Sequence, residues 1–384
     1  MKLFAQTLHF ERSLPVPRSL IPHSQPTFCR YQVLVHVLLT KVLRGTRCCL
    51  HQRRMPCILC CICLFLLIVC LHDSETLTQF FFVKTQKTPI PKLIWQIFLD
   101  ENGPPGHLKP ARQSWSALNP DHALELIDRP GLSFWLGNYL RDRPHLRRVL
   151  ADSTPRVFKA DILRYILLAQ YGGVYTDVDV MALKPVATWI PEEYQGLAEL
   201  VVGIEYDQLD WDGRWPGLEH SVQFCQWTMM AAPGHEVLRT IVDRATYAVL
   251  DLADKQSSDL GSLNLTNNDD VIATTGPGIW TAVILEYLRK KSNGVDLQYR
   301  DFSNLTKPTL LEDVLLLPVN AFATGQEHSG SVHEGSPDAL VRHAFSGSWK
   351  EDDQYNHWKT ERLEHELLAE FVSGQDILEK AEDE

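Results

Sequence analysis

Cysteine is nearly absent from the larger part of this chain. Of its nine cysteines, Cys225 alone lies beyond residue 72, and the others are Cys29, Cys48, Cys49, Cys57, Cys60, Cys61, Cys63 and Cys70. The long C-terminal body therefore cannot close an internal disulfide, which neither requires nor excludes a secretory location. The segments CILC and CCIC have the spacing of zinc ligands, but they lie in a run without polar residues, which favours membrane-facing thiols.

Basic charge is also scarce in this body. Residues 1–56 carry nine Lys or Arg against one Glu, whereas the residues beyond 72 carry 28 Lys or Arg against 47 Asp or Glu, a formal charge of −19. A body of this charge repels nucleic acid, and no basic patch interleaved with aromatic residues occurs in it. We therefore expect no nucleic-acid partner.

Long apolar runs are lacking too, with one exception. Residues 57–71, CILCCICLFLLIVCL, are 15 uncharged apolar residues, fewer than the roughly 20 that usually span a bilayer. Arg53 and Arg54 precede the run, and Asp73 and Glu75 follow it, so the positive-inside rule places the N-terminus in the cytosol. We expect a type II signal-anchor with the body in a lumen, and a cleaved signal peptide is the alternative.

The body alternates strand-like and helix-like segments. Strands are expected at 90–98, 174–180 and 201–207, and helices at 131–150, 157–170 and 237–253, with a short helix, a turn and a strand between 114 and 128. This order is typical of an α/β sandwich with a mainly parallel sheet. The glycine-rich loops lack the GxGxxG pattern, and there is no P-loop, so neither of these nucleotide-binding signatures applies.

The segment YGGVYTDVDV, residues 171–180, places two carboxylates at the end of an apolar strand. In a strand, Asp177 and Asp179 would point to one face, while Val178 and Val180 would point into the core. Two adjacent carboxylates repel each other, and a hard divalent cation such as Mg²⁺ or Mn²⁺ would offset that repulsion while leaving coordination positions for a diphosphate. A pair of solvated carboxylates at a sheet edge is the alternative interpretation.

The helix before this strand carries Asp161 and Arg164, one turn apart on the same face. An aspartate at this place can accept hydrogen bonds from ribose hydroxyls. A simple ion pair between residues i and i+3 is the alternative.

The block KADILRYILLAQYGGVYTDVDVMALKPV, residues 159–186, closely resembles the defining block of glycosyltransferase family 32. IPKLIWQI, VVGIEYD, QFCQWTMMAAPGH, TGPGIWT and HAFSGSWK resemble further parts of that family, over about residues 89–352. The resemblance implies a GT-A nucleotide-diphospho-sugar transferase fold, a Rossmann-like α/β/α sandwich that uses a metal-bound D-x-D motif and a nucleotide-sugar donor.

The resemblance also implies a metal site. Asp179 would bind the metal directly, and Asp177 would contact the ribose or donor sugar and the metal through water. His343, in HAFSGSWK, resembles a third metal contact, and a core or surface histidine is the alternative. Glu205 and Asp207 end a strand near the expected site and are weaker candidates for binding acceptor hydroxyls.

Further donor contacts follow from the same resemblance. Trp95 matches an aromatic residue that stacks on the nucleobase, although a core tryptophan is nearly as good an interpretation. Asp161 and Arg164 resemble residues that hold the ribose and the donor sugar. Ser348 and Trp349 match a loop that hydrogen-bonds the β-phosphate, for which an indole N–H is a suitable donor.

We therefore expect a retaining mannosyltransferase that uses Mn²⁺ or Mg²⁺ and GDP-mannose to extend an N-linked glycan in an α-1,6 outer chain. Its catalytic residues would be Asp177, Asp179, Arg164 and Trp349. An inositol phosphorylceramide mannosyltransferase, and a non-catalytic scaffold subunit of a mannan-polymerising complex, are the alternatives. The intact D-x-D motif favours an enzyme over a scaffold.

The expected organisation follows from these assignments. Residues 1–56 would form a basic cytosolic tail, 57–71 the membrane anchor, 72–88 a stem, 89–352 the GT-A catalytic domain and 353–384 an acidic helical tail. The protein would be a single-pass type II protein of the Golgi membrane with its catalytic domain in the lumen. A nucleotide sugar, an N-glycan acceptor and other Golgi mannosyltransferase subunits are its expected partners.

Overall fold

The computed structural model describes residues 88–345, apart from residues 139, 210–217, 266–267, 293, 327 and 333–334. The described residues belong to one compact unit. The expected cytosolic tail, the anchor at 57–71, nearly all of the stem and the C-terminal tail lie outside them.

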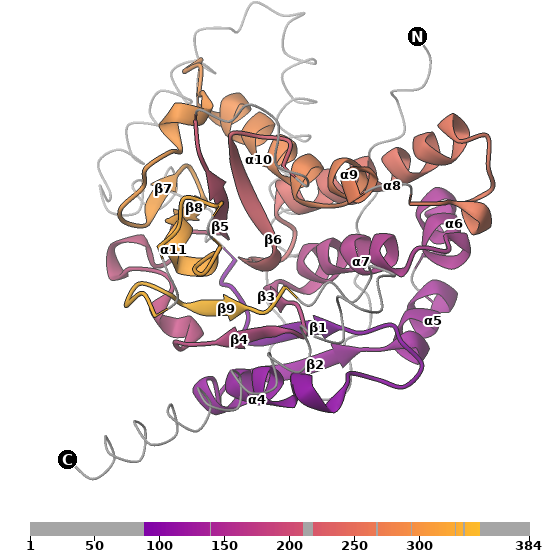
Figure 1. Ribbon diagram of the computed structural model, residues 1–384, viewed down its shortest axis with the longest axis horizontal. Helices are drawn as coiled ribbons and strands as arrows, with labels where there is room; N and C mark the ends of the chain where they lie inside the picture. Colours follow the sequence, from indigo (N-terminus) through magenta and orange to yellow (C-terminus); the bar gives the residue numbers. More distant parts are fainter. Residues whose placement is uncertain are drawn as a thin grey trace, which may run out of the picture. The chain divides into compact units, whose positions relative to one another are not determined.

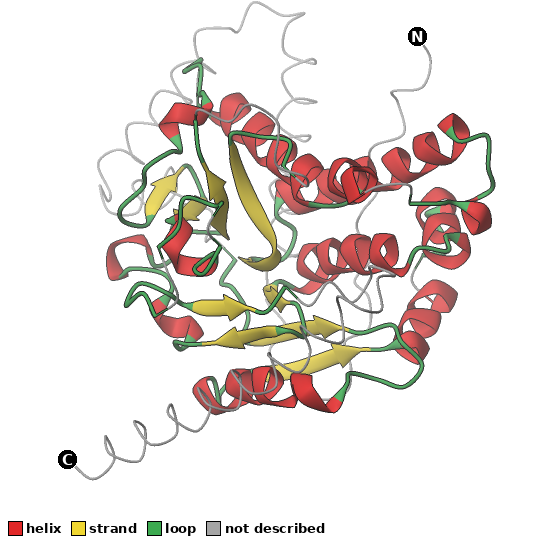
Figure 2. Ribbon diagram, viewed as in Figure 1, coloured by secondary structure: helices red, strands yellow, loops and turns green. Residues whose placement is uncertain are grey.

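A seven-stranded sheet runs through the centre of this unit (Figures 1 and 2), in the order β2-β1-β3-β6-β5-β8-β7. Its strands are β1 Leu93–Ile97, β2 Ala123–Ile127, β3 Gly173–Thr176, β5 Leu200–Asp207, β6 Val222–Ala231, β7 Thr309–Leu311 and β8 Val314–Leu317. The strand β1 is parallel to β2 and β3, and β5 is parallel to β8, whereas β6 is antiparallel to both of its neighbours and β7 is antiparallel to β8. The expected α/β class is confirmed.

The expectation of a mainly parallel sheet is confirmed for five of the seven strands, which run in one direction, while β6 and β7 run opposite to them, so the sheet is mixed. The strands β5 and β6 follow each other in the chain and are neighbours in the sheet, an arrangement that antiparallel pairing allows without a helical crossover. The strand β6 lies between β3 and β5, and its main chain therefore pairs with both halves of the sheet.

Helices cover both faces of the sheet (Figure 1). They are α4 Lys109–Leu118, α5 Arg129–Asn138, α6 Pro144–Asp152, α7 Arg156–Tyr171, α8 Glu236–Lys255, α9 Asn268–Thr274, α10 Pro277–Lys291 and α11 Val319–Phe322. Short 3₁₀ turns occur at Gly106–Leu108, Val186–Thr188, Glu192–Tyr194, Leu260–Ser262 and Tyr299–Asp301. Helices α7 and α10 pack on one face, and α4 and α11 pack on the other, so the unit has an α/β/α arrangement.

The helices expected at 157–170 and 237–253 are confirmed as α7 and α8. The helical pattern at 131–150 forms two helices, α5 and α6, because Pro144 stands in the first turn of α6. Proline has no N–H to donate and suits a helix start, but it interrupts a continuous helix.

The expectation that residues 174–180 form one strand is wrong. The strand β3 ends at Thr176, and a second strand, β4 Val180–Ala182, leaves the main sheet to pair with β9 Val341–His343 in a two-stranded antiparallel sheet. The amide of Val180 donates to the carbonyl of Asp177 over 3.1 Å, which is the hydrogen bond of a β-turn. Aspartate is favoured at the first position of such a turn, and this preference competes with the strand pattern.

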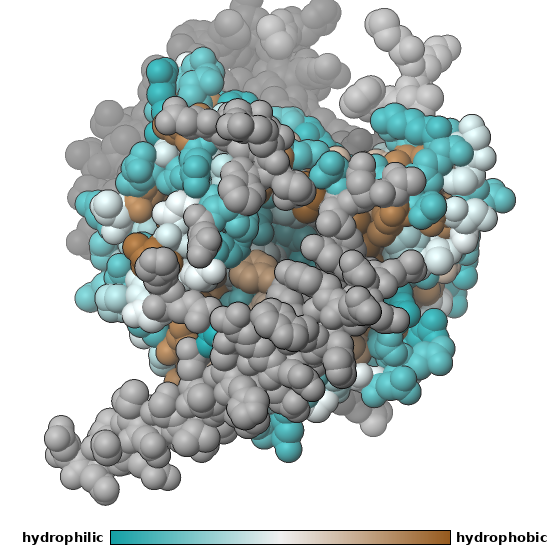
Figure 3. All heavy atoms as spheres, in the orientation of Figure 1, coloured by the Kyte–Doolittle hydropathy of each residue, from teal (hydrophilic) through white to brown (hydrophobic). Residues whose placement is uncertain are grey.

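The described residues hold one stretch, Asp269–Lys291, that is long and apolar enough to cross a membrane, with a mean hydropathy of 1.3. This stretch lies in α9 and α10, and 72% of its most apolar 18-residue window is buried inside the unit, as expected of a core helix in a globular domain. Hydrophilic side chains cover most of the described surface on the face shown in Figure 3.

Candidate functional site

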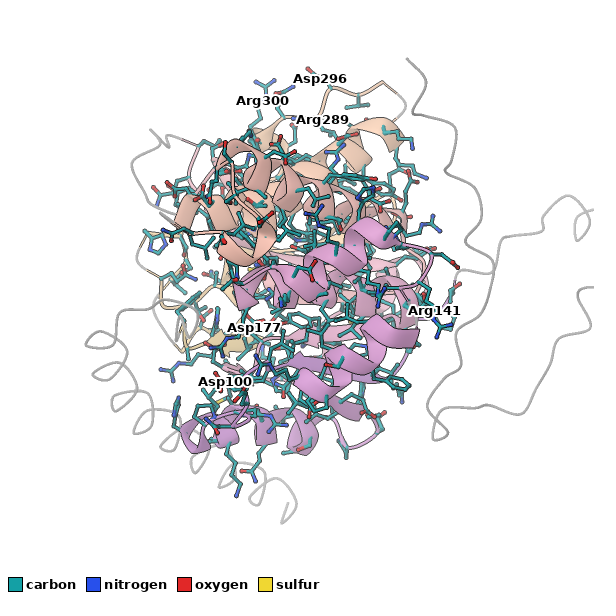
Figure 4. All side chains as sticks on the ribbon, turned by 90° about the vertical axis from the view of Figure 1, so that its right-hand side faces the viewer. Asp100, Arg141, Asp177, Arg289, Asp296 and Arg300 are labelled. Atoms are coloured by element: carbon teal, nitrogen blue, oxygen red, sulfur yellow. The ribbon has the colours of Figure 1, made fainter. Side chains whose placement is uncertain are left out.

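Three potential metal ligands from two distant segments meet at one end of β3. Asp177 and Asp179 lie in the turn between β3 and β4, and His343 lies at the end of β9. One ligand atom from each residue lies within 4.8 Å of the other two, and His343 Nε2 is 3.3 Å from Asp179 Oδ1. In Figure 4, Asp177 is labelled near Asp100 and well away from Arg289, Asp296 and Arg300 at the top of the view.

Backbone pairing brings these segments together. In the β4–β9 ladder, Val180 is the partner of His343, and the amide of Ala344 donates to the carbonyl of Asp179 over 3.0 Å. The histidine is therefore placed beside Asp179 by main-chain hydrogen bonds and not by its side chain alone.

Burial and mutual repulsion make the ionised forms of Asp177 and Asp179 unfavourable in free energy. Burial raises the pKa of Asp177, and the charge of Asp179 raises this pKa further, whereas Arg164 and His343 lower it. Asp179 is only 8% exposed. A bound cation would offset this repulsion, and two carboxylates with one imidazole form a ligand set that Mn²⁺ accepts.

Arg164 connects helix α7 to the turn that carries Asp177 and Asp179. Its Nη2 lies 2.8 Å from Asp161 Oδ1 and 3.4 Å from Asp177 Oδ1. Its Nη1 donates to the carbonyl of Gln226 over 3.1 Å and to the side-chain oxygen of Gln226 over 2.5 Å, and its guanidinium lies 4.7 Å from the ring centre of Tyr175. Asp161 and Gln226 thus fix the position of the guanidinium, and the guanidinium forms an ion pair with Asp177.

Asp161 is enclosed by protein, with 1% of its surface exposed. Besides Arg164, it accepts hydrogen bonds from Thr275 Oγ1 over 2.7 Å and from Gln226 Nε2 over 3.4 Å. Burial raises the pKa of Asp161, while the charge of Arg164 opposes this rise. The ion pair between Asp161 and Arg164 is therefore present. The contact of Asp161 with a ribose stays a prediction.

Trp95 lies in β1 and is 5% exposed. Its Nε1 donates to the carbonyl of Gly172 over 2.9 Å, and its ring lies 5.5 Å from that of Tyr171, at a tilt of 33°. Stacking of Trp95 on a nucleobase stays a prediction. Ser348 and Trp349 lie outside the described residues, and their predicted phosphate contacts are untested by this structure.

The two acidic residues near the end of β5 have different surroundings. Glu205 accepts hydrogen bonds from Gln223 Nε2 and Trp227 Nε1, each over 3.2 Å, and Trp227 lies against His343. Asp207 accepts from Ser303 Oγ over 2.5 Å and from the amide of Asn304 over 2.7 Å. Binding of acceptor hydroxyls by either carboxylate stays a prediction.

Sequence reasoning missed three side chains that shape the site, Gln226, Trp227 and Tyr175. Tyr175 donates a hydrogen bond to Asp177 Oδ1 over 2.5 Å, and its position two residues before Asp177 was the available signal. Gln226 lies inside the apolar run QFCQWTMM, and its polarity was a sign that it pairs with another buried polar group, since buried polar side chains need partners. Trp227 gave no signal, because a tryptophan in an apolar strand looks like any core residue.

Comparison with known proteins connects this geometry to a family. A family model described as "Glycosyltransferase sugar-binding region containing DXD motif" matches residues 105–195, which include the turn with Asp177 and Asp179.

Several fungal proteins are similar over most of the chain. An initiation-specific alpha-1,6-mannosyltransferase of Schizosaccharomyces pombe is 35% identical over 268 residues, which are 68% of this chain and 64% of the relative. A protein of the same name from Candida albicans is 31% identical over 309 residues, 73% of this chain and 78% of the relative. The putative glycosyltransferase HOC1 of Saccharomyces cerevisiae is 31% identical over 267 residues, 68% of this chain and 65% of the relative. The chain thus spans slightly less than two thirds of the first and third of these relatives.

Proposed function

Since this chain belongs to glycosyltransferase family 32, we propose that it is a retaining mannosyltransferase. It would transfer mannose from GDP-mannose to an N-linked glycan, in the α-1,6 linkage named in its relatives from S. pombe and C. albicans. The single observation that supports this most strongly is the convergence of Asp177, Asp179 and His343 within 4.8 Å. Two carboxylates and an imidazole this close together can bind the divalent cation that a metal-dependent nucleotide-sugar transferase uses.

Asp177, Asp179 and His343 would hold the divalent cation, with Mn²⁺ favoured over Mg²⁺ because one ligand is an imidazole. When bound, the cation supplies Lewis-acid neutralisation of the charge that develops on the departing diphosphate. The rest of the catalysis falls to groups of the chain itself.

Arg164 is the group best placed to act near the donor. It is fixed by Asp161 and Gln226 before any ligand binds, so no reorganisation is needed when charge develops during the reaction. It also orients Asp177, whose Oδ1 lies 3.4 Å from Arg164 Nη2. Trp349 and Ser348 are proposed to donate hydrogen bonds to the β-phosphate, and Trp95 to stack on the base.

Retention is proposed to proceed on one face of the sugar. The bond between the anomeric carbon and the phosphate oxygen breaks, the acceptor oxygen bonds to the same face of that carbon, and the acceptor proton passes to the departing phosphate oxygen. GDP and an α-linked mannoside are the products, so atoms and charge balance without a nucleophile from the protein.

The fold type, the membrane anchor and the location of the protein are proposed as well. The mixed sheet with helices on both faces is consistent with a GT-A fold. Residues 57–71 are proposed to anchor a type II protein in the Golgi membrane, with the described unit in the lumen and other mannosyltransferase subunits as partners. The uncharged run and its basic N-terminal flank support this orientation.

A donor comparison tests the proposal. The full-length chain, solubilised in detergent with Mn²⁺, is given GDP-mannose, UDP-glucose or UDP-galactose and a high-mannose N-glycan, each with and without EDTA. EDTA-sensitive transfer from GDP-mannose alone, with an α-1,6 product by NMR, is expected. Transfer from a UDP-sugar, or transfer that survives EDTA, would contradict the donor or the metal assignment. Folded protein that turns over no donor would favour the scaffold alternative.

A further inference from the structure

His343 lacks the hydrogen bond that usually fixes a metal-binding histidine. Its Nε2 faces Asp179, while its buried Nδ1 has no hydrogen-bond partner among the described residues. Histidine ligands almost always donate from their second ring nitrogen to a carboxylate, a carbonyl or water, which sets the ring orientation. Among the described residues, the groups that can orient the ring of His343 are therefore those that pack against it.

Two aromatic rings lie against His343. The ring of Trp227 is 4.4 Å from the imidazole, at a tilt of 38°, and the ring of Phe345 is 3.9 Å from it, at a tilt of 44°. Phe345 adopts a left-handed backbone conformation, with φ of 49°. A non-glycine residue in this conformation is uncommon and persists where the surroundings determine it.

The indole of Trp227 is itself held by a hydrogen bond to Glu205. Its Nε1 donates to Glu205 Oε1 over 3.2 Å, and Glu205 Oε2 accepts from Gln223 Nε2 over 3.2 Å. Trp227 is 5% exposed and lies in the central strand β6. The plane of the indole is therefore fixed by a hydrogen bond as well as by packing.

Trp227 also contacts the other half of the cluster. Its backbone carbonyl accepts a hydrogen bond from the amide of Asp177 over 2.9 Å. One residue thus holds the start of the acidic turn through its main chain and the imidazole of His343 through its side chain.

We propose that Trp227, oriented by Glu205, is the residue that positions His343 for metal binding, in place of the usual hydrogen bond to the second ring nitrogen. This inference rests on the proposed function insofar as a divalent cation binds at this cluster. It goes further by assigning the geometry of the site to a residue outside the ligand group of Asp177, Asp179 and His343.

Binding of Mn²⁺ alone to the full-length chain in detergent tests the proposal, with free Mn²⁺ measured by electron paramagnetic resonance and no donor or acceptor present. Trp227→Leu removes the ring, and we expect the Kd for Mn²⁺ to rise by about 10- to 100-fold, the range typical of second-shell partners. Trp227→Phe keeps a ring but loses the hydrogen bond to Glu205, so we expect a smaller rise. Glu205→Leu removes the oxygen that accepts from Trp227 Nε1, and we expect a rise in Kd comparable to that of Trp227→Phe.

A matched control is Trp280→Phe. Trp280 is fully buried, and its Nε1 donates to the carbonyl of Cys225 over 3.0 Å, so this change also removes one indole hydrogen bond in the core. Among the described residues, Trp280 stacks on Tyr165 and not on His343. We expect Trp280→Phe to lower the melting temperature as much as Trp227→Phe does and to leave the Kd for Mn²⁺ unchanged.

A double-mutant cycle with His343→Ala decides whether Trp227 acts through the histidine. Once the imidazole is absent, Trp227→Leu should have no further effect on the Kd. An equal effect of Trp227→Leu in both backgrounds would overturn the proposal, because the tryptophan would then act on the acidic turn or on the fold. Unchanged binding in folded Trp227→Leu or Trp227→Phe would overturn it as well.

These outcomes are separate from a failure of the proposed function. If the chain binds Mn²⁺ through Trp227 and His343 but transfers another sugar, the positioning role stands and the donor assignment fails. If mannose transfer is confirmed while Trp227 has no influence on Mn²⁺ binding, the positioning role fails alone. If His343→Ala binds Mn²⁺ as tightly as the unmodified chain, both the metal ligand and its positioning are wrong.

Discussion

Val180 and His343 lie opposite each other in the antiparallel ladder of β4 and β9. The metal cluster is therefore assembled by strand pairing. This pairing joins the acidic turn, residues 177–179, to β9, which lies near the C-terminal end of the described residues. Because Val180 directly follows Asp179, pairing at this position fixes the spacing between the carboxylate and the imidazole.

Removing one carboxylate of the acidic pair should abolish metal binding without weakening the fold. In Asp179→Asn, repulsion with Asp177 is lost, so the melting temperature in EDTA should equal or exceed that of the unmodified chain. Ligand binding to the folded state stabilises the unmodified chain by about 2.7 kcal/mol at a Mn²⁺ concentration of 100 Kd, and this gain should vanish in the variant. Melting with EDTA and with Mn²⁺ measures both effects.

Asp254→Asn, at an exposed position of α8, is the control for that experiment and should retain the full gain from Mn²⁺. If Asp179→Asn also retains the gain, Asp179 is not a ligand. If it melts far below the unmodified chain in EDTA, the carboxylate has a structural role instead.

The buried pair of Asp161 and Arg164 should be important for stability. Their side chains are 1% and 6% exposed, and removing one partner of a buried pair leaves an uncompensated charge at a cost of about 3–5 kcal/mol. Because Asp177 still faces Arg164 in Asp161→Ala, we expect about 3 kcal/mol, measured by chemical denaturation in EDTA.

Arg244→Ala provides the comparison, because Arg244 pairs with Glu286 at the surface, where the two side chains are 40% and 62% exposed. Such exposed pairs contribute at most about 1 kcal/mol. A loss in Asp161→Ala no larger than that in Arg244→Ala would show that the buried pair contributes no net stability.

The parts of the site that follow from local sequence were predictable, and those that depend on long-range pairing were not. The apolar spacing of α7 and the glycines after it predict the helix that presents Asp161 and Arg164, and the D-x-D pair predicts a cation. The pairing of β4 with β9 has no local signal, because strand register depends on a partner that is distant in the chain. The role of Trp227 depends on the same pairing and is equally hidden.

Glu205 should make the stability of the metal-free chain depend on pH. Burial raises the pKa of its carboxyl above the ordinary value of 4.5, although hydrogen bonds from Gln223 and Trp227 oppose this rise. The folded chain therefore holds this proton more tightly than the unfolded chain. The resulting stability is fully present below about pH 4.5 and is lost as pH rises through the folded pKa.

Glu205→Gln removes the titrating carboxyl, and with it the loss of stability at higher pH. Relative to the unmodified chain, the variant should become more stable as pH rises from about 4 toward 7, and the difference should level off above the folded pKa. Chemical denaturation in EDTA across this range measures the difference. Glu125→Gln on β2 serves as the control, and a pH dependence equal to that of Glu205→Gln would remove Glu205 as the cause.

Gly173 is required for the strand that carries the acidic turn. Its φ is +95°, and a Cβ at this position would lie 2.5 Å from the carbonyl oxygen of Leu93 in β1. An alanine would be strained in this conformation, at about 1–3 kcal/mol, and would also push β3 away from β1, at a similar further cost. We expect Gly173→Ala to destabilise the chain by about 3 kcal/mol or more in chemical denaturation and to weaken Mn²⁺ binding, because β3 leads directly into Asp177.

Gly137→Ala makes the same chemical change where the backbone does not need glycine. Gly137 lies in helix α5, and no atom lies within 4 Å of a Cβ built on it. Alanine is favoured over glycine inside a helix by about 0.5–1 kcal/mol, so this variant should be slightly more stable, with unchanged Mn²⁺ binding. If the two variants have equal stability, contact between β3 and β1 at Gly173 is not what holds the acidic turn in place, and the position of Asp177 must then depend on Arg164 and β6.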